Sequence, residues 1–85
     1  MTEAEMRKRR LRWHCRRGML ELDILLTHFF DERYDALSAE DLLLFEQVLA
    51  QEDSVLYAWF IEGDRPAPPQ LADFVTQIGQ NRTRP

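Results

Sequence analysis

Hydrophobic residues recur every three or four positions along most of this chain, which is the spacing of one face of an α-helix. No segment alternates between polar and apolar residues for long enough to indicate a strand. The pattern predicts an all-α fold, a small five-helix bundle. Four buried stripes carry this prediction: Met19, Leu22, Leu25, Leu26, Phe29 and Phe30; Leu42, Phe45, Val48 and Leu49; Val55, Leu56, Trp59 and Phe60; and Leu71, Phe74, Val75 and Ile78.

The first predicted helix, about residues 3–16, has a weak apolar face. Leu11 and Cys15 lie at positions i and i+4, whereas Met6 and Trp13 fall off that line. We therefore expect this helix to be half exposed. An exposed tryptophan beside arginine is the composition of an interface hot spot, so Trp13 has two open interpretations, an interface residue or a core residue.

Capping residues mark several helix ends. Ser38, with Asp41 three residues on, predicts the start of the third helix. Asp53 and Ser54 are predicted to cap the fourth helix, and Gly63 is expected to close it.

The chain of 85 residues is the size of one domain with a thin core. Its only linker-like segment, residues 66–69, has the sequence Pro-Ala-Pro-Pro. We predict a single helical domain over residues 1–85, with a core at about 3–80. The polar residues from Gln80 onward, above all the tail at 81–85, are expected to be frayed.

Charge is distributed unevenly along the chain, although the net charge is only −4. Residues 1–17 hold seven Arg or Lys and two Glu, a balance of +5. Residues 18–64 hold one Arg and twelve Asp or Glu, a balance of −11. A bipolar protein of this kind can steer a partner with complementary patches.

The expected compartment is the bacterial cytoplasm. The single cysteine cannot form an internal disulfide, which fits a reducing environment. No run of about 18 apolar residues could span a membrane, and the basic segment leads into no signal-peptide core. The helical pattern begins almost at residue 1, which leaves no space for a removable transit peptide.

Residues typical of enzymes are mostly missing from the sequence, so we expect no catalytic activity and no bound cofactor. There is no glycine-rich phosphate loop and no zinc-binding motif. His14 and Cys15 are adjacent, and neighbours on a helix point about 100° apart, which suits a nucleophile pair poorly. Cys15 is interpreted as a small buried hydrophobe. His28 lies on another helix without a thiolate cluster, so no metal site is predicted.

The motif at the centre of the sequence is Arg17-Gly18-x-x-Glu21, where the basic segment meets the acidic one. A glycine here accepts positive φ and can end one helix before the next begins. Local physics alone explains the two charges as favourable partners of helix dipoles.

A wider set of residues resembles the SdhE/Sdh5 family of assembly factors, which promote covalent attachment of FAD to the flavoprotein subunit of succinate dehydrogenase. The resemblance covers about residues 10–66 and is carried by an ordered series: Trp13 to Asp23, Phe30-Asp31-Glu32, Tyr34 to Ser38, Phe45-Glu46, Asp53, Trp59 and Gly63. It implies a five-helix bundle that binds the flavoprotein subunit of succinate dehydrogenase, and in bacteria also that of fumarate reductase. The implied contribution is orientation of this client protein rather than a catalytic side chain.

The resemblance also implies a partner-binding surface on a protein that we expect to be monomeric. In it, Glu21 would bond polar groups of the client, Arg17 would brace Glu21 or meet a client acid, and Gly18 would let client backbone approach closely. The residues implied as that surface and its neighbours are Arg17, Gly18, Glu21, Trp13, His14, Arg16 and Asp23.

Two alternatives belong to other classes of function. Bacterial members of the family are also described as antitoxins of an inner-membrane toxin, and co-purification of such a toxin would indicate that function. The second alternative is RNA binding through the basic residues at 7–17. The acidic bulk that follows them would repel a long nucleic acid, so RNA is the less favoured partner.

Overall fold

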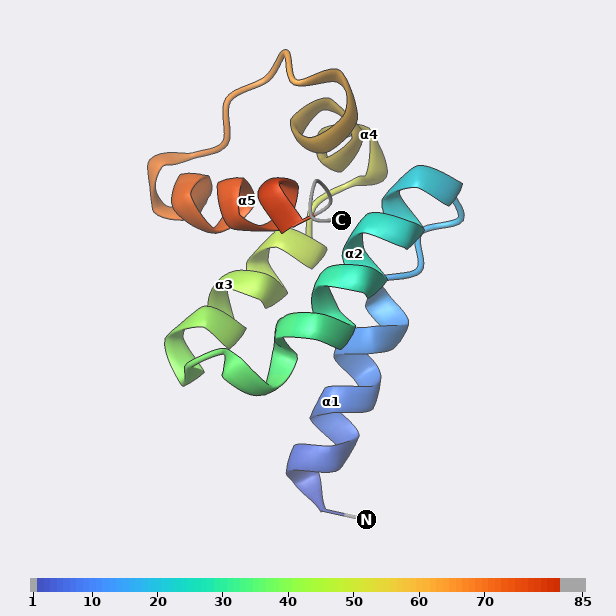
Figure 1. The fold of residues 1–85 in the computed structure, drawn as a ribbon, viewed down its shortest axis with the longest axis vertical. Helices are drawn as coiled ribbons and strands as arrows, with labels where there is room; N and C mark the ends of the chain where they lie inside the picture. The colour runs from blue at the N-terminus through green and yellow to red at the C-terminus, as the bar shows by residue number, and fades with distance from the viewer. Residues whose placement is uncertain (1, 82–85) are drawn as a thin grey trace.

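Five helices joined by short connections form the computed structural model, which describes residues 2–81 (Figure 1). No strand occurs in that range, so the predicted all-α bundle is confirmed. The helical elements are α1 (Glu3–His14), α2 (Leu20–Arg33), the 3-10 turn η1 (Tyr34–Ala36), α3 (Ala39–Leu49), α4 (Asp53–Tyr57), the π-helical turn η2 (Ala58–Glu62) and α5 (Pro69–Asn81).

Three phenylalanines, one each from α2, α3 and α5, meet at the centre of the core. The ring of Phe29 lies edge-on to the rings of Phe45 and Phe74, at centroid distances of 5.5 and 5.6 Å. Phe45 and Phe74 are 5.7 Å apart. Each such pair contributes about 0.5–1.5 kcal/mol beyond its buried area, so this contact fixes α5 against α2 and α3.

Two helix ends agree with their predicted capping residues. Ser38 forms a capping box with Asp41, in which each side chain bonds the other residue's backbone N–H. Gly63 closes the fourth helical segment with a left-handed φ of 68°, the conformation that glycine adopts without strain. The segment it closes is continuous from α4 into η2.

Two predicted helix ends are wrong. The first helix ends at His14, two residues short of Arg16, because the chain turns there towards α2. Asp53 does not cap α4, whose N-cap is Glu52; Asp53 is the first residue inside the helix. Its carboxylate is instead bonded to Arg17, a residue far away in the sequence.

The predicted fraying of Gln80 and of residue 81 is also wrong. Helix α5 runs through both positions, and Asn81 is buried. Its Nδ2 donates a hydrogen bond to Glu32 Oε1 on α2 at 3.0 Å, which secures the last turn of the helix. The rest of the tail, residues 82–85, lies outside the described part of the chain.

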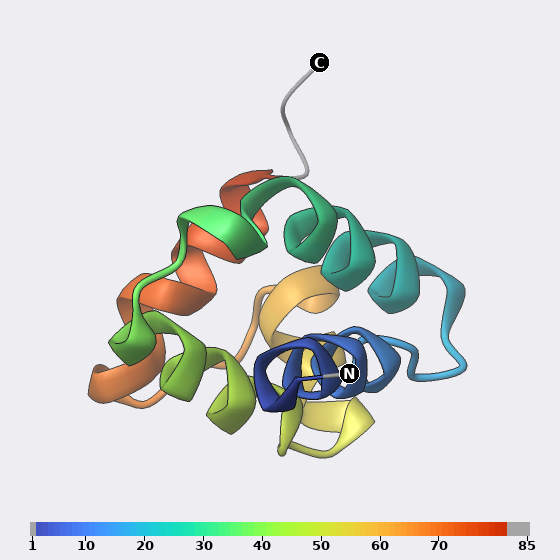
Figure 2. The same cartoon turned by 90° about the horizontal axis from the view of Figure 1, so that it is seen from below.

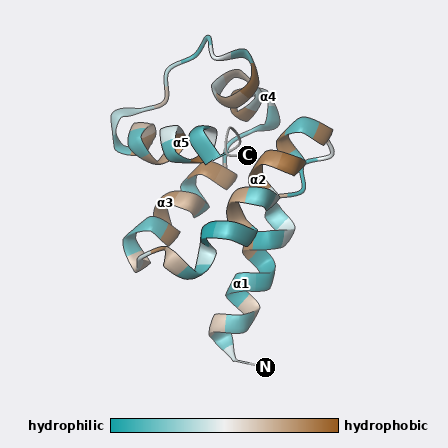
Figure 3. Cartoon of the chain, in the orientation of Figure 1, coloured by the Kyte–Doolittle hydropathy of each residue, from teal (hydrophilic) through white to brown (hydrophobic). Residues whose placement is uncertain are grey.

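Helix α1 lies beside both α2 and α3, as the view along it shows (Figure 2). It is hydrophilic along most of its length, whereas α2 begins with strongly hydrophobic residues (Figure 3). Its buried residue is Leu11, followed by the buried Cys15 just past its end. A mostly polar helix needs charge pairs as well as burial to hold it in place.

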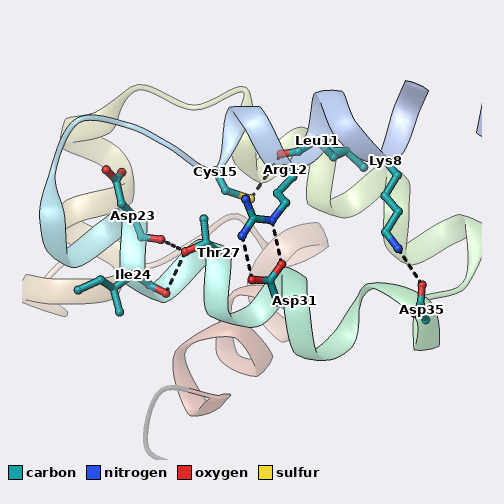
Figure 4. A network of polar contacts seen from close by, with 9 residues as sticks. All are labelled: Lys8, Leu11, Arg12, Cys15, Asp23, Ile24, Thr27, Asp31 and Asp35. Carbon is teal, nitrogen blue, oxygen red and sulfur yellow. Dashed lines mark hydrogen bonds and ion pairs between the residues drawn. The ribbon is translucent and has the colours of Figure 1, made fainter. Parts of the chain in front are cut away.

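Ion pairs attach α1 to α2 and η1 (Figure 4). Arg12 donates two hydrogen bonds to the carboxylate of Asp31, at 2.9 and 3.0 Å, and Lys8 lies 3.4 Å from Asp35. The hydrogen bonds from Arg12 hold the pKa of the Asp31 carboxyl below its usual value. Within residues 2–81, no helix combines the length and apolarity that crossing a bilayer requires.

Candidate functional site

A tight turn between α1 and α2 presents Gly18 to solvent. Its φ is 83°, in the left-handed region that favours glycine. A Cβ built on this glycine would meet no atom within 4 Å, so no packing contact inside the protein requires its absence. The backbone conformation requires glycine here, and the space above it is open to a partner.

Arg17 forms the base of this turn and points inward. Its Nε donates to Asp53 Oδ1 at 2.8 Å. Its two terminal nitrogens donate to three backbone carbonyls, those of His14 at 3.1 Å, Leu49 at 2.8 Å and Gln51 at 2.7 Å. The side chain is only 16% exposed. One guanidinium thus ties the α1–α2 turn to the connection between α3 and α4.

This position differs from the role that the sequence suggested for Arg17. Its guanidinium braces Asp53 and not Glu21, and four of its five N–H donors are already used inside the protein. Asp23 belongs to the same inner arrangement, because its Oδ1 accepts the backbone N–H of Arg17 at 2.5 Å. Both residues therefore hold the turn in shape.

Glu21 lies on the outer side, exposed in the first turn of α2, as its position off the core stripe predicted. It borders a shallow hollow of about 270 Å³ between α2 and η2, whose other lining residues include Ile24, His28 and Ile61. Ile24 is 58% exposed and Leu20 is 74% exposed. A carboxylate flanked by exposed aliphatic side chains is a composition suited to binding protein.

Leu20 and Ile24 were missed in the sequence as site residues. The signal that could have found them is their spacing, because they lie at i and i+4 outside the buried stripe of their helix. Large apolar residues on the polar side of an amphipathic helix have no core to fill. We call Gly18, Leu20, Glu21 and Ile24 the outer surface of the turn.

The remaining predicted site residues lie at the end of α1. Trp13 is 67% exposed, which excludes core packing in the isolated chain. Its role as an interface residue stays a prediction. The guanidinium of Arg16 lies over its ring, 5.8 Å from the centroid. His14 lines a different hollow, between α1 and α3.

The seven predicted residues thus divide between three places. Arg17 and Asp23, together with Asp53, form what we call the inner clamp. Gly18 and Glu21 belong to the outer surface, and the other three lie at the end of α1.

Cys15 is confirmed as a buried hydrophobe. Its side chain is fully buried, and burial raises the pKa of the thiol to about 12. Its Sγ donates to the carbonyl of Leu11 (Figure 4). In residues 2–81, no group of three or more His, Cys, Asp or Glu side chains is arranged to hold a metal ion.

Comparison with known proteins identifies what this arrangement belongs to. A family model described as Sdh5, flavinator of succinate dehydrogenase, matches residues 9–82. The chain belongs to the Sdh5 family. The matched range contains the inner clamp, the outer surface and the end of α1, so the whole candidate site is part of the family's shared region.

Individual relatives agree with the Sdh5 assignment. The chain is 45% identical over 73 residues to the FAD assembly factor SdhE of Idiomarina loihiensis, covering 86% of this chain and 81% of that protein. It is 49% identical over 69 residues to the protein of the same name from Shewanella oneidensis, covering 81% of this chain and 84% of that protein. It is 43% identical over 74 residues to the FAD assembly factor SdhE of Pseudomonas aeruginosa, covering 87% of this chain and 88% of that protein.

Proposed function

We propose that this Sdh5-family chain is an assembly factor that binds the flavoprotein subunit of succinate dehydrogenase and promotes covalent attachment of its FAD. The observation that carries the proposal is the exposed outer surface of the turn, held in a fixed shape by the Arg17 clamp, in a member of this family. We include the fumarate reductase flavoprotein as a second client. The working complex is proposed to pair one monomer with one client in the bacterial cytoplasm.

The outer surface supports binding rather than bond making. Gly18 lets client backbone come close, because it has no side chain. Glu21 supplies an acceptor for client N–H groups, and Leu20 and Ile24 supply apolar area that becomes buried on binding. The Arg17 clamp fixes these groups before the client arrives, which reduces the entropy lost on association.

The chain acts by orientation and is not itself an enzyme in this proposal. Holding the client's domains so that its histidine and the flavin meet raises the rate of a step that the client performs. The inertness of Cys15 supports this assignment, since the buried thiol, with its raised pKa, is a poor nucleophile.

The charge pairs of α1 weigh against the RNA-binding alternative. Lys8 and Arg12 are engaged with acids of η1 and α2, and Arg7 is paired with Glu46 on α3. Arginines already bound to carboxylates would have to give up those partners to neutralise phosphates. A protein partner with a mixed surface fits this helix better.

A deletion strain tests the proposed function directly. Without the gene, the flavoprotein subunit of succinate dehydrogenase should carry much less covalent flavin, measured by in-gel flavin fluorescence of the denatured subunit. A plasmid copy should restore it, and the subunit should co-purify with the tagged chain. Normal covalent flavin in the deletion strain, or co-purification of a membrane toxin in place of the subunit, would contradict the proposal.

A further inference from the structure

A groove runs between α1 and α3. It lies on a different side of α1 from the ion pairs that Lys8 and Arg12 form with η1 and α2. Arg7, Arg10 and His14, at helical spacings of three and four, face Glu46 across a hollow of about 290 Å³. A second hollow of about 380 Å³ shares Arg7, Arg10 and Glu46 and also touches Glu3, so the two continue along α1.

Among the residues that the structure describes, Arg10 is left without an internal partner in this groove. Arg7 Nη2 lies 2.9 Å from Glu46 Oε2, but Arg10 and the His14 ring have no ion pair or side-chain hydrogen bond with any residue in the range 2–81. On the other side of α1, Lys8 and Arg12 are both paired with acids. Arg10 is therefore a cation of the groove that no acid within the described residues neutralises.

The floor of the groove is apolar. Leu11 and Leu49 line the hollow that Arg7, Arg10 and His14 border, and both are buried members of the core. A guanidinium above an apolar floor binds a carboxylate more strongly than one in open water, because the pair is partly shielded from solvent. The groove thus combines an unpaired arginine and a free histidine ring with an apolar base, as a contact site for an acidic side chain does.

We propose that this groove receives an acidic segment of the client flavoprotein, with a client carboxylate on Arg10 and His14. The inference rests on the proposed function and adds a second contact to the outer surface of the turn. A protein segment fits better than a nucleic acid, because residues 18–64 carry a net charge of −11 that repels an extended polyanion. A short acidic segment can enter the groove without crossing that surface.

Glu46 competes with the client for the groove. In the free protein the Glu46 carboxylate is paired with Arg7, so the incoming carboxylate meets Arg10 first. Replacing Glu46 by glutamine keeps the shape of the side chain and leaves Arg7 available. A purely structural ion pair would give no gain of binding on this substitution, whereas competition gives one.

The test measures affinity for the purified flavoprotein subunit of succinate dehydrogenase, produced without covalent flavin, at about 50 mM and about 300 mM NaCl. The variants are Arg10→Glu and Glu46→Gln. Arg65→Glu, on the exposed connection before α5, is the matched control because it makes the same charge change elsewhere. Thermal melts confirm that each variant is folded.

Arg10→Glu should weaken binding about 10-fold at the lower salt and less at the higher, since salt screens an exposed pair. Glu46→Gln should tighten binding about 3-fold, and Arg65→Glu should change it less than about 2-fold. An octaglutamate peptide should compete with the subunit more strongly than an octauridylate RNA does.

Two results overturn the groove proposal and leave the proposed function standing. One is wild-type affinity of the Arg10→Glu variant for the subunit. The other is competition by the RNA and not by the peptide, which would make the groove a phosphate site. A wild-type chain that fails to bind the subunit at all would overturn the proposed function as well.

Discussion

Arg17 and Glu21 lie four residues apart in one motif, yet their surroundings are opposite. The guanidinium of Arg17 is nearly buried and bonded to one carboxylate and three carbonyls. Glu21 is exposed between two aliphatic side chains. The comparison teaches that one short motif can contain a nearly buried residue that shapes the surface and an exposed residue that is available to a partner.

The inner clamp should dominate folding stability. Arg17→Ala removes a charge-assisted network and leaves Asp53 and three carbonyls without their donor. The expected loss is about 2–4 kcal/mol, towards the lower end because Asp53 is partly exposed. For a domain of this size the melting temperature should fall by about 10–25 °C, measured by circular dichroism.

Arg17→Lys is the control for the clamp, because it keeps the charge and loses the planar fork. We expect it to recover only part of the stability. An Arg17→Ala variant that melts with the wild type would show that the network contributes little, and the distinction between inner clamp and outer surface would fail.

Gly18 lies between Arg17 of the inner clamp and Glu21 of the outer surface. Two substitutions separate its effect on folding from its proposed effect on client approach. Gly18→Ala and Gly18→Arg should each cost about 1–2 kcal/mol of folding free energy, because any side chain strains the backbone at positive φ. In the free protein a Cβ at this position meets no other atom within 4 Å. Only arginine should also block client backbone, so Gly18→Arg should lose flavinylation at a temperature where both variants are folded.

The Gly18 comparison uses melts beside a covalent-flavin assay on the client subunit. Equal flavinylation by the two variants would show that close approach at this position is not needed.

The aliphatic part of the outer surface should affect binding without affecting folding. A double variant, Leu20→Ser with Ile24→Ser, should bind the flavoprotein subunit about 10-fold or more weakly, since apolar area no longer becomes buried on binding. Its melting temperature should stay close to that of the wild type. Leu43→Ser is the control and should bind normally, because Leu43 on α3 is 55% exposed, close to the 58% of Ile24, and lies outside the outer surface of the turn.

The smallest effect concerns Cys15, next to the clamp on its inner side. Burial raises the pKa of this thiol from 9.0 to about 12, so the folded state disfavours the thiolate. Burial of the protonated thiol therefore contributes fully to the free energy of unfolding below about pH 9. That contribution is lost as the pH rises towards 12, because the unfolded thiol ionises first. At pH 8 the native thiol should react with Ellman's reagent about 100-fold more slowly than the urea-unfolded thiol. Equal rates would show that the base of the turn is open.

Local sequence patterns predicted the parts of the fold that depend on neighbouring residues. Helical periodicity identified four of the five helices, and Ser38 and Gly63 marked ends that the structure confirms. The exposure of Glu21 followed from its place off the core stripe. In each case the deciding contacts lie within one or two helical turns, where sequence spacing is informative.

Long-range pairs account for what the sequence did not predict. The local sequence predicts Asp53 as a helix cap, because no residue close to it in the sequence indicates that Arg17 binds its carboxylate. The last turn of α5 looked too polar to hold, because its partner Glu32 lies on another helix. The π-helical winding of η2 likewise has no local sequence signal that we identified.

The most direct test of the central claim is Glu21→Ala, with folding and binding measured on the same preparation. Circular dichroism melts should show a loss of about 1 kcal/mol or less, because an exposed first-turn carboxylate contributes little to the free fold. Affinity for the flavoprotein subunit, measured by calorimetry, should fall about 30-fold or more, because a client donor is left unpaired. A variant that melts far below the wild type, or one that binds the subunit with wild-type affinity, would contradict the assignment of Glu21 to the binding surface.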